Sequence, residues 1–476
     1  MIKTGKELAA EGTWEHAEEA VMGCIGLNMR DTEALFKKLC GEDFPFEEYH
    51  EICDRRVKEK IEKEGLPLKK GVRELLAYLK EAGYKIALAS STGQGGVLRH
   101  LERAKLREYF TVVIGGDMIE HGKPEPDIYL RACEELGVEP ETAFAVEDSA
   151  NGIRSASSAG LSTIMVPDLI VPTPEMEQLL YARYDSLLDV RDMLMVQDGV
   201  LKAPVRIVLE GLCNTRDLGG YRSKDGRRIK PHKLIRSGAL ANSTEADRKT
   251  LISEYELKTI VDFRTQSERN MKPDPALAGI TYIDHPILEE ETMGITREKE
   301  TEGKNDIVKN VISTLQKNGG TPLGYMQDMY KNLITNPFSR ERYAEFFDIL
   351  LAADEGAVLW HCTAGKDRAG VATLLLLSAL DIPREQIMLD YMKVNEFGRE
   401  EVDALMQALT GRIDMPAKEA QEADEAIRLL LTVDRSYAES VFAVMEKECG
   451  SVDAFLEKGM GLTGQKRELL KNKYLE

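Results

Sequence analysis

The chain reads His361-Cys362-Thr363-Ala364-Gly365-Lys366-Asp367-Arg368 near the middle of its second half. An apolar run at 357–360 precedes these residues, and a segment with a helical pattern at 369–380 follows them. This order predicts a buried strand, a tight loop, and a helix whose N-terminus opens on the loop. A thiol therefore starts the loop and an arginine ends it.

A loop of this kind suits phosphate chemistry. Successive backbone N–H groups at a helix N-terminus, here those of 363–368, bind phosphate oxygens. Arg368 can hold two further oxygens in its planar fork. The same positive surroundings favour the thiolate form of Cys362, which is the nucleophilic form. The alternative is a structural cysteine buried beside a helix cap.

Three ordered motifs resemble those of cysteine-dependent protein tyrosine phosphatases: the His-Cys-x5-Arg loop, Asn214-Thr215-Arg216-Asp217-Leu218-Gly219-Gly220-Tyr221, and Ile260-Val261-Asp262-Phe263-Arg264. The last two resemble the bacterial and fungal subgroup called tyrosine phosphatase family 3. The resemblance implies an α/β phosphatase domain over 205–476 that uses a phosphocysteine and no metal or other cofactor. It also implies phosphotyrosine as the preferred substrate. A phosphoinositide, another small molecule, or simple binding of phosphorylated partners are the alternatives.

The resemblance also implies roles for single residues. Cys362 is the nucleophile, Arg368 the phosphate clamp, and His361 the residue that orients the loop. Asp262, at the carboxyl end of its strand, is expected to be the general acid, with Asp367 inside the loop as its rival. A structural Asp262 that only pairs with Arg264 or caps a helix is the other alternative.

Two residues of the loop region carry further hypotheses. Many phosphatases of this type place Ser or Thr where this chain has Ala369, so slow breakdown of the intermediate is expected unless a hydroxyl such as that of Thr363 substitutes. Lys366 resembles a cation that contacts additional phosphate groups in phosphoinositide phosphatases. The simpler interpretation of Lys366 is that it raises the positive potential of the loop.

The first part of the chain alternates helices and short apolar strands. Strands are expected at 84–90, 110–114, 142–146 and 162–166, with helices such as 126–136 between them. This alternation predicts a parallel sheet covered by helices.

Three segments of this part resemble motifs of the haloacid dehalogenase superfamily, in its β-phosphoglucomutase-like branch: 88–92, 121–126 and 146–149. The resemblance implies a Rossmann-like domain over 1–195 with a helical cap at about 1–67. It also implies that Ser90 and Lys123 hold a phosphoryl group and that Glu147 and Asp148 bind Mg²⁺.

The Asp-x-Asp nucleophile motif of that superfamily is missing, because the first aspartate of the chain is Asp31. Loss of the central strand that carries the motif would leave the edges of two other strands unpaired. Two explanations are open: the natural chain starts about 15 residues earlier, or the domain is a catalytically dead remnant. Retention of the other motif residues favours the first explanation, and Mg²⁺ is expected to bind only in a complete domain.

Composition is consistent with two cytoplasmic domains. The chain has 476 residues, of which 43% are hydrophobic and 30% charged. A net charge of −19 argues against nucleic-acid binding. No apolar stretch is long enough to span a membrane. The seven cysteines form no Cys-x-x-Cys pair, as expected of reduced thiols.

A polar stretch with Gly and Pro, 196–204, is the expected linker between the domains. In the second domain, apolar residues at helical spacing predict an amphipathic helix, which is either a lid over the active site or an ordinary packed helix; they are Ile307, Val308, Val311, Ile312 and Leu315.

Overall fold

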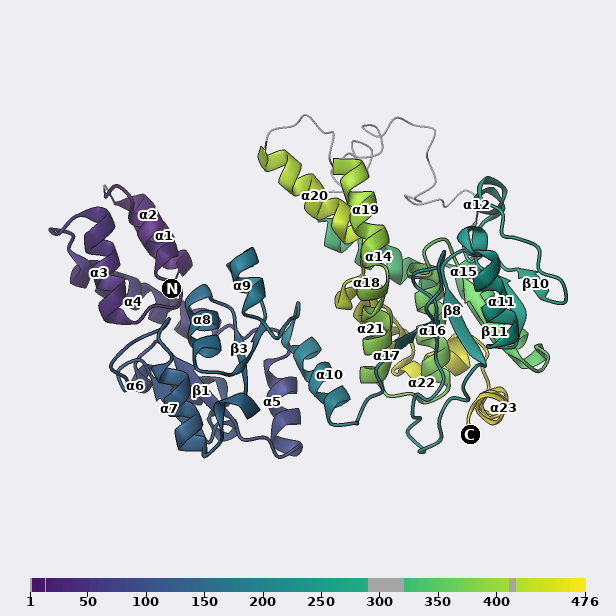
Figure 1. Cartoon of the computed structure of the whole chain (residues 1–476), viewed down its shortest axis with the longest axis horizontal. Helices are drawn as coiled ribbons and strands as arrows, with labels where there is room; N and C mark the ends of the chain where they lie inside the picture. The colour runs from purple at the N-terminus through teal and green to yellow at the C-terminus, as the bar shows by residue number, and fades with distance from the viewer. Residues whose placement is uncertain (1, 13, 290–320, 411–416) are drawn as a thin grey trace. The chain divides into compact units, whose positions relative to one another are not determined.

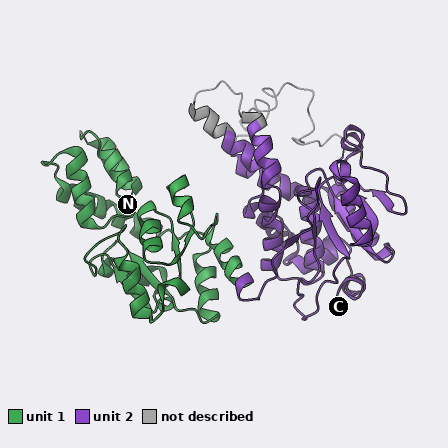
Figure 2. Ribbon diagram, viewed as in Figure 1, with its two compact units in different colours: residues 1–195 green, residues 196–476 purple. Residues whose placement is uncertain are grey.

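The computed structural model describes residues 2–12, 14–289, 321–410 and 417–476. The chain divides into two compact units, Met1–Met195 and Val196–Glu476 (Figures 1 and 2). Helix α10 (Leu187–Gln197) spans this division, so the helix continues two residues into the stretch expected to be a linker. The predicted amphipathic helix at 307–315 lies outside the described residues.

The first unit begins with four helices that pack around an aromatic core formed by Phe36, Phe44, Phe46 and Tyr49. The helices are α1 (Ile2–Glu11), α2 (Ala17–Gly23), α3 (Met29–Cys40) and α4 (Phe46–Glu64). Helix α5 (Val72–Glu81) precedes the first strand, and the helices between the strands are α6 (Gln94–Ala104), α7 (Asp127–Leu136), α8 (Ala150–Ser158) and α9 (Pro174–Gln178).

Two parallel sheets form the rest of this unit, β1 with β2 and β3 with β4 and β5. The strands are β1 (Ala87–Ser90), β2 (Val112–Gly115), β3 (Phe144–Glu147), β4 (Ser162–Met165) and β5 (Ala182–Arg183). Parallel pairing and the helix–strand alternation confirm the predicted α/β fold. Within the described part no ladder joins β1 to β3, so the expected single sheet is divided, although one apolar cluster contacts both strands.

Strand β1 is shorter than the apolar run that predicts it. The run starts at Tyr84, but the N–H of Tyr84 donates to the carbonyl of Leu79 at the end of α5. Pairing with β2 starts only at Ala87, opposite Val112. The first residues of the run therefore end a helix instead of extending the strand.

A six-stranded sheet organises the second unit, in the order β10-β9-β11-β8-β7-β6. The first four strands in this order are parallel, and β7 and β6 continue the sheet antiparallel. The strands are β6 (Val205–Arg206), β7 (Arg216–Asp217), β8 (Leu234–Ser237), β9 (Leu257–Asp262), β10 (Thr281–Asp284) and β11 (Ala357–His361). Strand β11 lies between β8 and β9 and is buried along its length.

Helices of the second unit pack around this sheet and against one another (Figure 1). Helix α16 is almost entirely buried and forms the centre of the largest apolar cluster. The helices are α11 (Glu245–Ser253), α12 (Gln266–Met271), α14 (Pro322–Thr335), α15 (Pro337–Ala352), α16 (Asp367–Ala379), α17 (Arg384–Met392), α18 (Val394–Phe397), α19 (Arg399–Thr410), α20 (Ala417–Leu431), α21 (Arg435–Cys449), α22 (Val452–Ala454) and α23 (Gly464–Tyr474).

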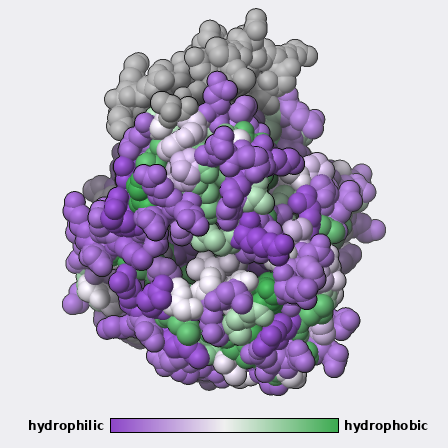
Figure 3. Space-filling view, turned by 90° about the vertical axis from the view of Figure 1, so that its left-hand side faces the viewer, coloured by the Kyte–Doolittle hydropathy of each residue, from purple (hydrophilic) through white to green (hydrophobic). Residues whose placement is uncertain are grey.

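On the face drawn in Figure 3, hydrophilic side chains surround smaller hydrophobic areas. Among the described residues, no helix combines the length and the apolar character that are needed to cross a membrane.

Candidate active site

The His-Cys-x5-Arg residues form a loop between the central strand β11 and helix α16. His361 is the last residue of β11, and Arg368 lies in the first turn of α16, which starts at Asp367. Cys362 follows the strand directly and is only 2% exposed. The helix thus begins two residues earlier than the apolar pattern predicts, because the end of the loop is itself helical.

The carbonyl groups of 363–365 are all held from outside the loop. The N–H of Ala239 donates to the carbonyl of Thr363 at 3.1 Å. Asn214 Nδ2 donates to the next two carbonyls at 3.1 and 3.2 Å, and Arg236 also donates to the last of them at 2.9 Å. In a planar trans peptide the N–H points opposite to the carbonyl. The N–H groups of 364–366 therefore face the inside of the loop, as an anion cradle requires.

Gly365 is required where it stands. Its φ is +64°, a conformation that favours glycine, and a Cβ there would lie 2.3 Å from the carbonyl oxygen of Ser237. The loop can therefore pass close to the end of β8 only with glycine at this position.

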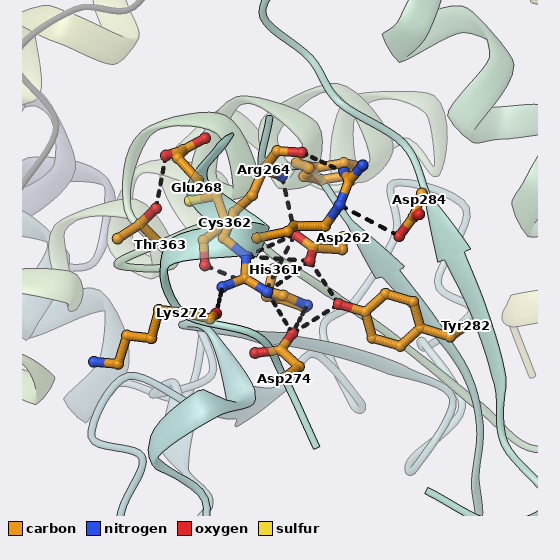
Figure 4. Close-up of polar contacts among 12 residues, drawn as sticks. Asp262, Arg264, Glu268, Lys272, Asp274, Tyr282, Asp284, His361, Cys362 and Thr363 are labelled. Carbon is orange, nitrogen blue, oxygen red and sulfur yellow. Dashed lines mark hydrogen bonds and ion pairs between the residues drawn. The ribbon is translucent and has the colours of Figure 1, made fainter. Parts of the chain in front are cut away.

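Arg368 is buried and forms a bidentate ion pair with Glu268 of α12, with both N···O distances at 2.6 Å. Thr363 Oγ1 donates to the same carboxylate at 2.9 Å (Figure 4). Burial alone would raise the pKa of Glu268, but the hydrogen bonds and charge of Arg368 outweigh it and hold the pKa at about 2. Glu268 is therefore an anion that fixes the orientation of the guanidinium group.

Asp262 does not have the surroundings of a general acid. It is fully buried, and its oxygens accept hydrogen bonds from the backbone N–H and the side chain of Arg264 and from Tyr282 (Figure 4). Burial alone would raise its pKa, but the charges of His361 and Arg264 hold the pKa at about 2. An anion held in this way has no proton to give, so the geometry favours the structural alternative, the pair with Arg264.

His361 lies between two carboxylates. Its Nε2 is 3.1 Å from Asp274 Oδ2, and its Nδ1 is 3.8 Å from Asp262 Oδ1. These three residues have the donor atoms for a metal ion within 4.8 Å of one another. However, the guanidinium group of Arg264 lies 2.7 and 2.8 Å from the two carboxylates. The arginine already supplies the positive charge, so this cluster does not suit a metal.

Asp367 is placed differently. It stands at the N-terminus of α16, where its Oδ1 accepts a hydrogen bond of 2.6 Å from the hydroxyl of Tyr330, and its side chain is 29% exposed. Burial and the charge of Asp367 raise the pKa of Tyr330 well above its ordinary value, so the tyrosine remains a donor. One carboxylate oxygen is thus fixed, which orients the group as a whole.

Lys366 turns away from the inside of the loop. Its side chain is 5% exposed, and Nζ donates to the backbone carbonyls of Leu430 and Thr432, at 2.5 and 3.2 Å, at the C-terminal end of α20. The hypothesis that Lys366 contacts additional phosphate groups does not fit this geometry. The ammonium group instead joins the loop to α20, where a cation is favourable next to the helix C-terminus.

Ala369 lies in the first turn of α16 and is completely buried. An alanine side chain has no hydroxyl group. The hydroxyl of Thr363, the expected substitute, is occupied, because it donates to Glu268 and accepts from Arg368. Neither position 363 nor position 369 therefore offers an unengaged hydroxyl group.

The sequence pattern did not point to Glu268, Asn214 or Arg236. Glu268 is the fourth residue of a Thr-x-x-Glu capping box, in which Thr265 is the N-cap of α12. That signal predicts a helix start and not a partner for an arginine 100 residues later. Asn214 is the first residue of the motif at 214–221, but its contact with the loop joins chain segments that are 150 residues apart.

In the first unit, the predicted residues lie together at the ends of β1 and β3. Lys123 Nζ forms an ion pair with Glu147 and donates to the carbonyl of Ala89, next to Ser90. Glu147 also accepts hydrogen bonds from Tyr129 and Ser149. The structure therefore brings residues of the three motifs together.

The fit of this cluster to Mg²⁺ is poor. The Glu147 carboxylate is buried and held by Lys123, and the partly exposed Asp148 carboxylate pairs with Lys69 at 3.3 Å. Mg²⁺ needs oxygen ligands in an octahedral arrangement, and lysines already neutralise both carboxylates.

Comparison with known proteins shows that two parts of the chain resemble two different protein families. The model of the haloacid dehalogenase-like hydrolases matches residues 1–166. The "Phosphorylated carbohydrates phosphatase" of Thermotoga maritima is 43% identical over 138 residues, which are 29% of this chain and 57% of that protein. CbbY from Rhodobacter sphaeroides, solved with phosphate, covers 39% of this chain and 85% of its own at 29% identity, with a TM-score of 0.34.

The segment that matches the Thermotoga maritima phosphatase spans little more than half of that protein. A Cupriavidus necator protein named as a putative tyrosine-protein phosphatase is 27% identical over 263 residues, which are 53% of this chain and 84% of that protein. The model of the tyrosine phosphatase family matches residues 207–476, more than half of the chain, and these residues contain the whole loop of Cys362 and Arg368. With an additional haloacid dehalogenase-like part at its N-terminal end, the chain belongs to the tyrosine phosphatase family.

Proposed function

We propose that the second unit hydrolyses phosphate monoesters through a phosphocysteine on Cys362. The observation that carries this proposal is the loop itself. Its carbonyls are held from outside, so its N–H groups surround an anion site above the thiol. Arg368 adds a guanidinium group held by Glu268. Fixed donors of this kind stabilise charge that develops on the phosphoryl oxygens in the transition state.

In the first step the Cys362 thiolate attacks phosphorus, and the bond from phosphorus to the ester oxygen breaks. The leaving oxygen takes a proton from Asp367. In the second step water attacks the phosphocysteine while Asp367 accepts a proton from the water. The thiolate leaves, inorganic phosphate is released, and both residues return to their first state.

Asp367 is preferred to Asp262 as the acid for two reasons. Asp367 is partly exposed beside the loop, whereas Asp262 is fully buried and has a pKa of about 2. Asp367 also has one oxygen held by Tyr330, which leaves the other to face a leaving group. Asp262, with Arg264 and Tyr282, would then support His361 and the start of the loop.

Phosphotyrosine in proteins is the substrate that we propose first. The family and the Cupriavidus relative support this choice. Lys366 would favour a phosphoinositide if its ammonium group faced the substrate, but that group is bound to the end of α20. A protein that binds phosphorylated partners and turns over slowly is the second candidate, because Ala369 and the occupied Thr363 hydroxyl both favour a long-lived intermediate.

The test is hydrolysis of 4-nitrophenyl phosphate by the full chain and by Cys362→Ser, each with EDTA and with added Mg²⁺. Activity that survives EDTA and is lost in the variant supports the proposal. Activity that requires Mg²⁺ and ignores the variant would assign turnover to the first unit and reject it. A phosphotyrosine peptide and a phosphoinositide, compared under the same conditions, separate the substrate classes.

A further inference from the structure

Behind the catalytic loop, two arginines share one aspartate. Arg216 and Arg236 are fully buried, and Asp390 of α17 is 1% exposed. Arg216 Nε is 2.8 Å from Asp390 Oδ1, and Arg236 Nη1 is 2.8 Å from Asp390 Oδ2. The hydroxyl of Tyr221 donates to the same carboxylate at 3.0 Å.

The charges of this cluster do not balance. Two guanidinium groups face one carboxylate, and the other acceptors that they contact are neutral: the side chain of Asn214 and the backbone carbonyls of Gly365 and Asp390. Burial and the charge of Arg216 lower the pKa of Arg236 to about 10, which still leaves it protonated at neutral pH. Tyr221 stays uncharged, because burial and Asp390 raise its pKa well above its ordinary value.

Arg236 is the member of the cluster that contacts the loop. Its Nη1 binds Asp390, and its Nη2 donates to the carbonyl of Gly365 at 2.9 Å. Its charge also interacts with Cys362, as does that of Arg368. Because these groups are buried, water screens their interactions only weakly.

We propose that Arg236 is a positioning residue for the phosphatase reaction. It orients the Gly365–Lys366 peptide so that the N–H of this peptide faces the phosphate, and it supplies a second buried positive charge for the thiolate and the bound oxyanion. This inference rests on the proposed function. Arg216 acts indirectly. It neutralises Asp390 and donates to the side chain of Asn214, which in turn donates to the carbonyl of Gly365.

A purely structural role would not require the second cation. Removing a buried charge from water is costly, and one arginine is enough to neutralise one aspartate. The extra charge is instead found beside a loop that must hold a thiolate and a doubly charged phosphate. Arg236→Met should therefore be tolerated by the fold, because Asp390 keeps its pair with Arg216.

The experiment measures the rate of Cys362 alkylation by iodoacetamide against pH, in the full-length chain, with Arg236→Met, Arg236→Lys and Tyr221→Phe. Inorganic phosphate is then added to find the concentration that protects half of the thiol. Tyr221→Phe is the matched control, since it disturbs Asp390 but changes no charge and touches no loop atom. Circular dichroism checks that each variant is folded.

In Arg236→Met, the alkylation midpoint should move to higher pH and the half-protecting phosphate concentration should rise roughly fivefold, as expected for loss of a nearby cation. Arg236→Lys should restore the midpoint, because the positive charge is kept. It should not restore the affinity for phosphate, because a single ammonium group replaces the planar guanidinium group that contacts both Asp390 and Gly365. Tyr221→Phe should match the wild type in both measurements.

An unchanged midpoint and unchanged protection in Arg236→Met would overturn the inference. If that variant does not fold, Arg236→Lys decides alone, and wild-type affinity for phosphate in it rejects the positioning role. A Cys362 that neither reacts as a thiolate nor is protected by phosphate in the wild type would reject the proposed function itself, so the two failures are distinct.

Discussion

Arg368 and Glu268 form a bidentate ion pair, with both N···O distances at 2.6 Å, between residues 100 positions apart in the chain. The same carboxylate accepts from the N–H of Thr265 at the start of α12 and from the hydroxyl of Thr363 in the loop. One acidic residue therefore caps the N-terminus of a helix and holds the guanidinium group of Arg368 in place.

Glu268→Gln should lower kcat/KM for 4-nitrophenyl phosphate by roughly ten- to a hundredfold, because the guanidinium group is no longer held in one plane. The measurement is steady-state kinetics beside a thermal unfolding curve. Glu245→Gln, in an exposed first-turn position of α11, is the control. Equal kcat/KM in the two variants would show that the clamp needs no acidic partner.

The Arg368–Glu268 pair should also make stability depend on pH. Glu268 has a pKa of about 2 in the folded chain against an ordinary value of 4.5. A depressed pKa means that the pair stabilises the fold fully above pH 4.5 and progressively less as the pH falls towards 2. Urea unfolding at several pH values should show wild type and Glu268→Gln converging over this range. A difference that stays constant down to pH 2 would contradict the assignment.

Asp367→Asn should remove the basic limb of the pH–rate profile. With phenyl phosphate, whose leaving group needs a proton, kcat should fall by about 10²-fold, and with 4-nitrophenyl phosphate much less. Asp262→Asn should lower the unfolding temperature, since Arg264 loses a buried partner, yet keep the basic limb. Loss of that limb in the Asp262 variant alone would restore Asp262 as the acid.

Lys366→Met should change stability more than substrate choice. The ammonium group binds carbonyls at the end of α20, so its loss should lower the unfolding temperature by a few degrees. The ratio of kcat/KM for a phosphoinositide to that for 4-nitrophenyl phosphate should remain the same. Lys331→Met, on the exposed side of α14, serves as the control. A selective loss of phosphoinositide turnover would show that Lys366 reaches substrate.

Breakdown of the phosphocysteine should limit turnover, because Ala369 has no hydroxyl and that of Thr363 is engaged. Stopped-flow assays with 4-nitrophenyl phosphate should therefore show a burst of one nitrophenolate per active site. Ala369→Ser should reduce the burst and raise the steady-state rate. The absence of a burst in the wild type would indicate that the first step is the slow one.

The alternation of helices and strands in the first unit follows from local sequence, as does the strand–loop–helix around Cys362. Helical and strand periodicities depend on neighbouring residues, so they are readable without the fold. The resemblance assigned Lys123 to a phosphoryl group and Glu147 to Mg²⁺, whereas in the structure the two side chains form an ion pair with each other. Strand ends were less well predicted, as at Tyr84, because pairing with β2 decides where the strand starts.

By itself, the sequence determined which groups the site contains: a thiol, an arginine and a run of loop N–H groups with glycine at 365. Only the tertiary structure decided their roles. Asp262 became a buried partner of Arg264, Lys366 a link to α20, and Glu268 the support of Arg368. The physical reason is that an ionisable side chain takes its state from the charges and the burial around it, and distant segments supply both.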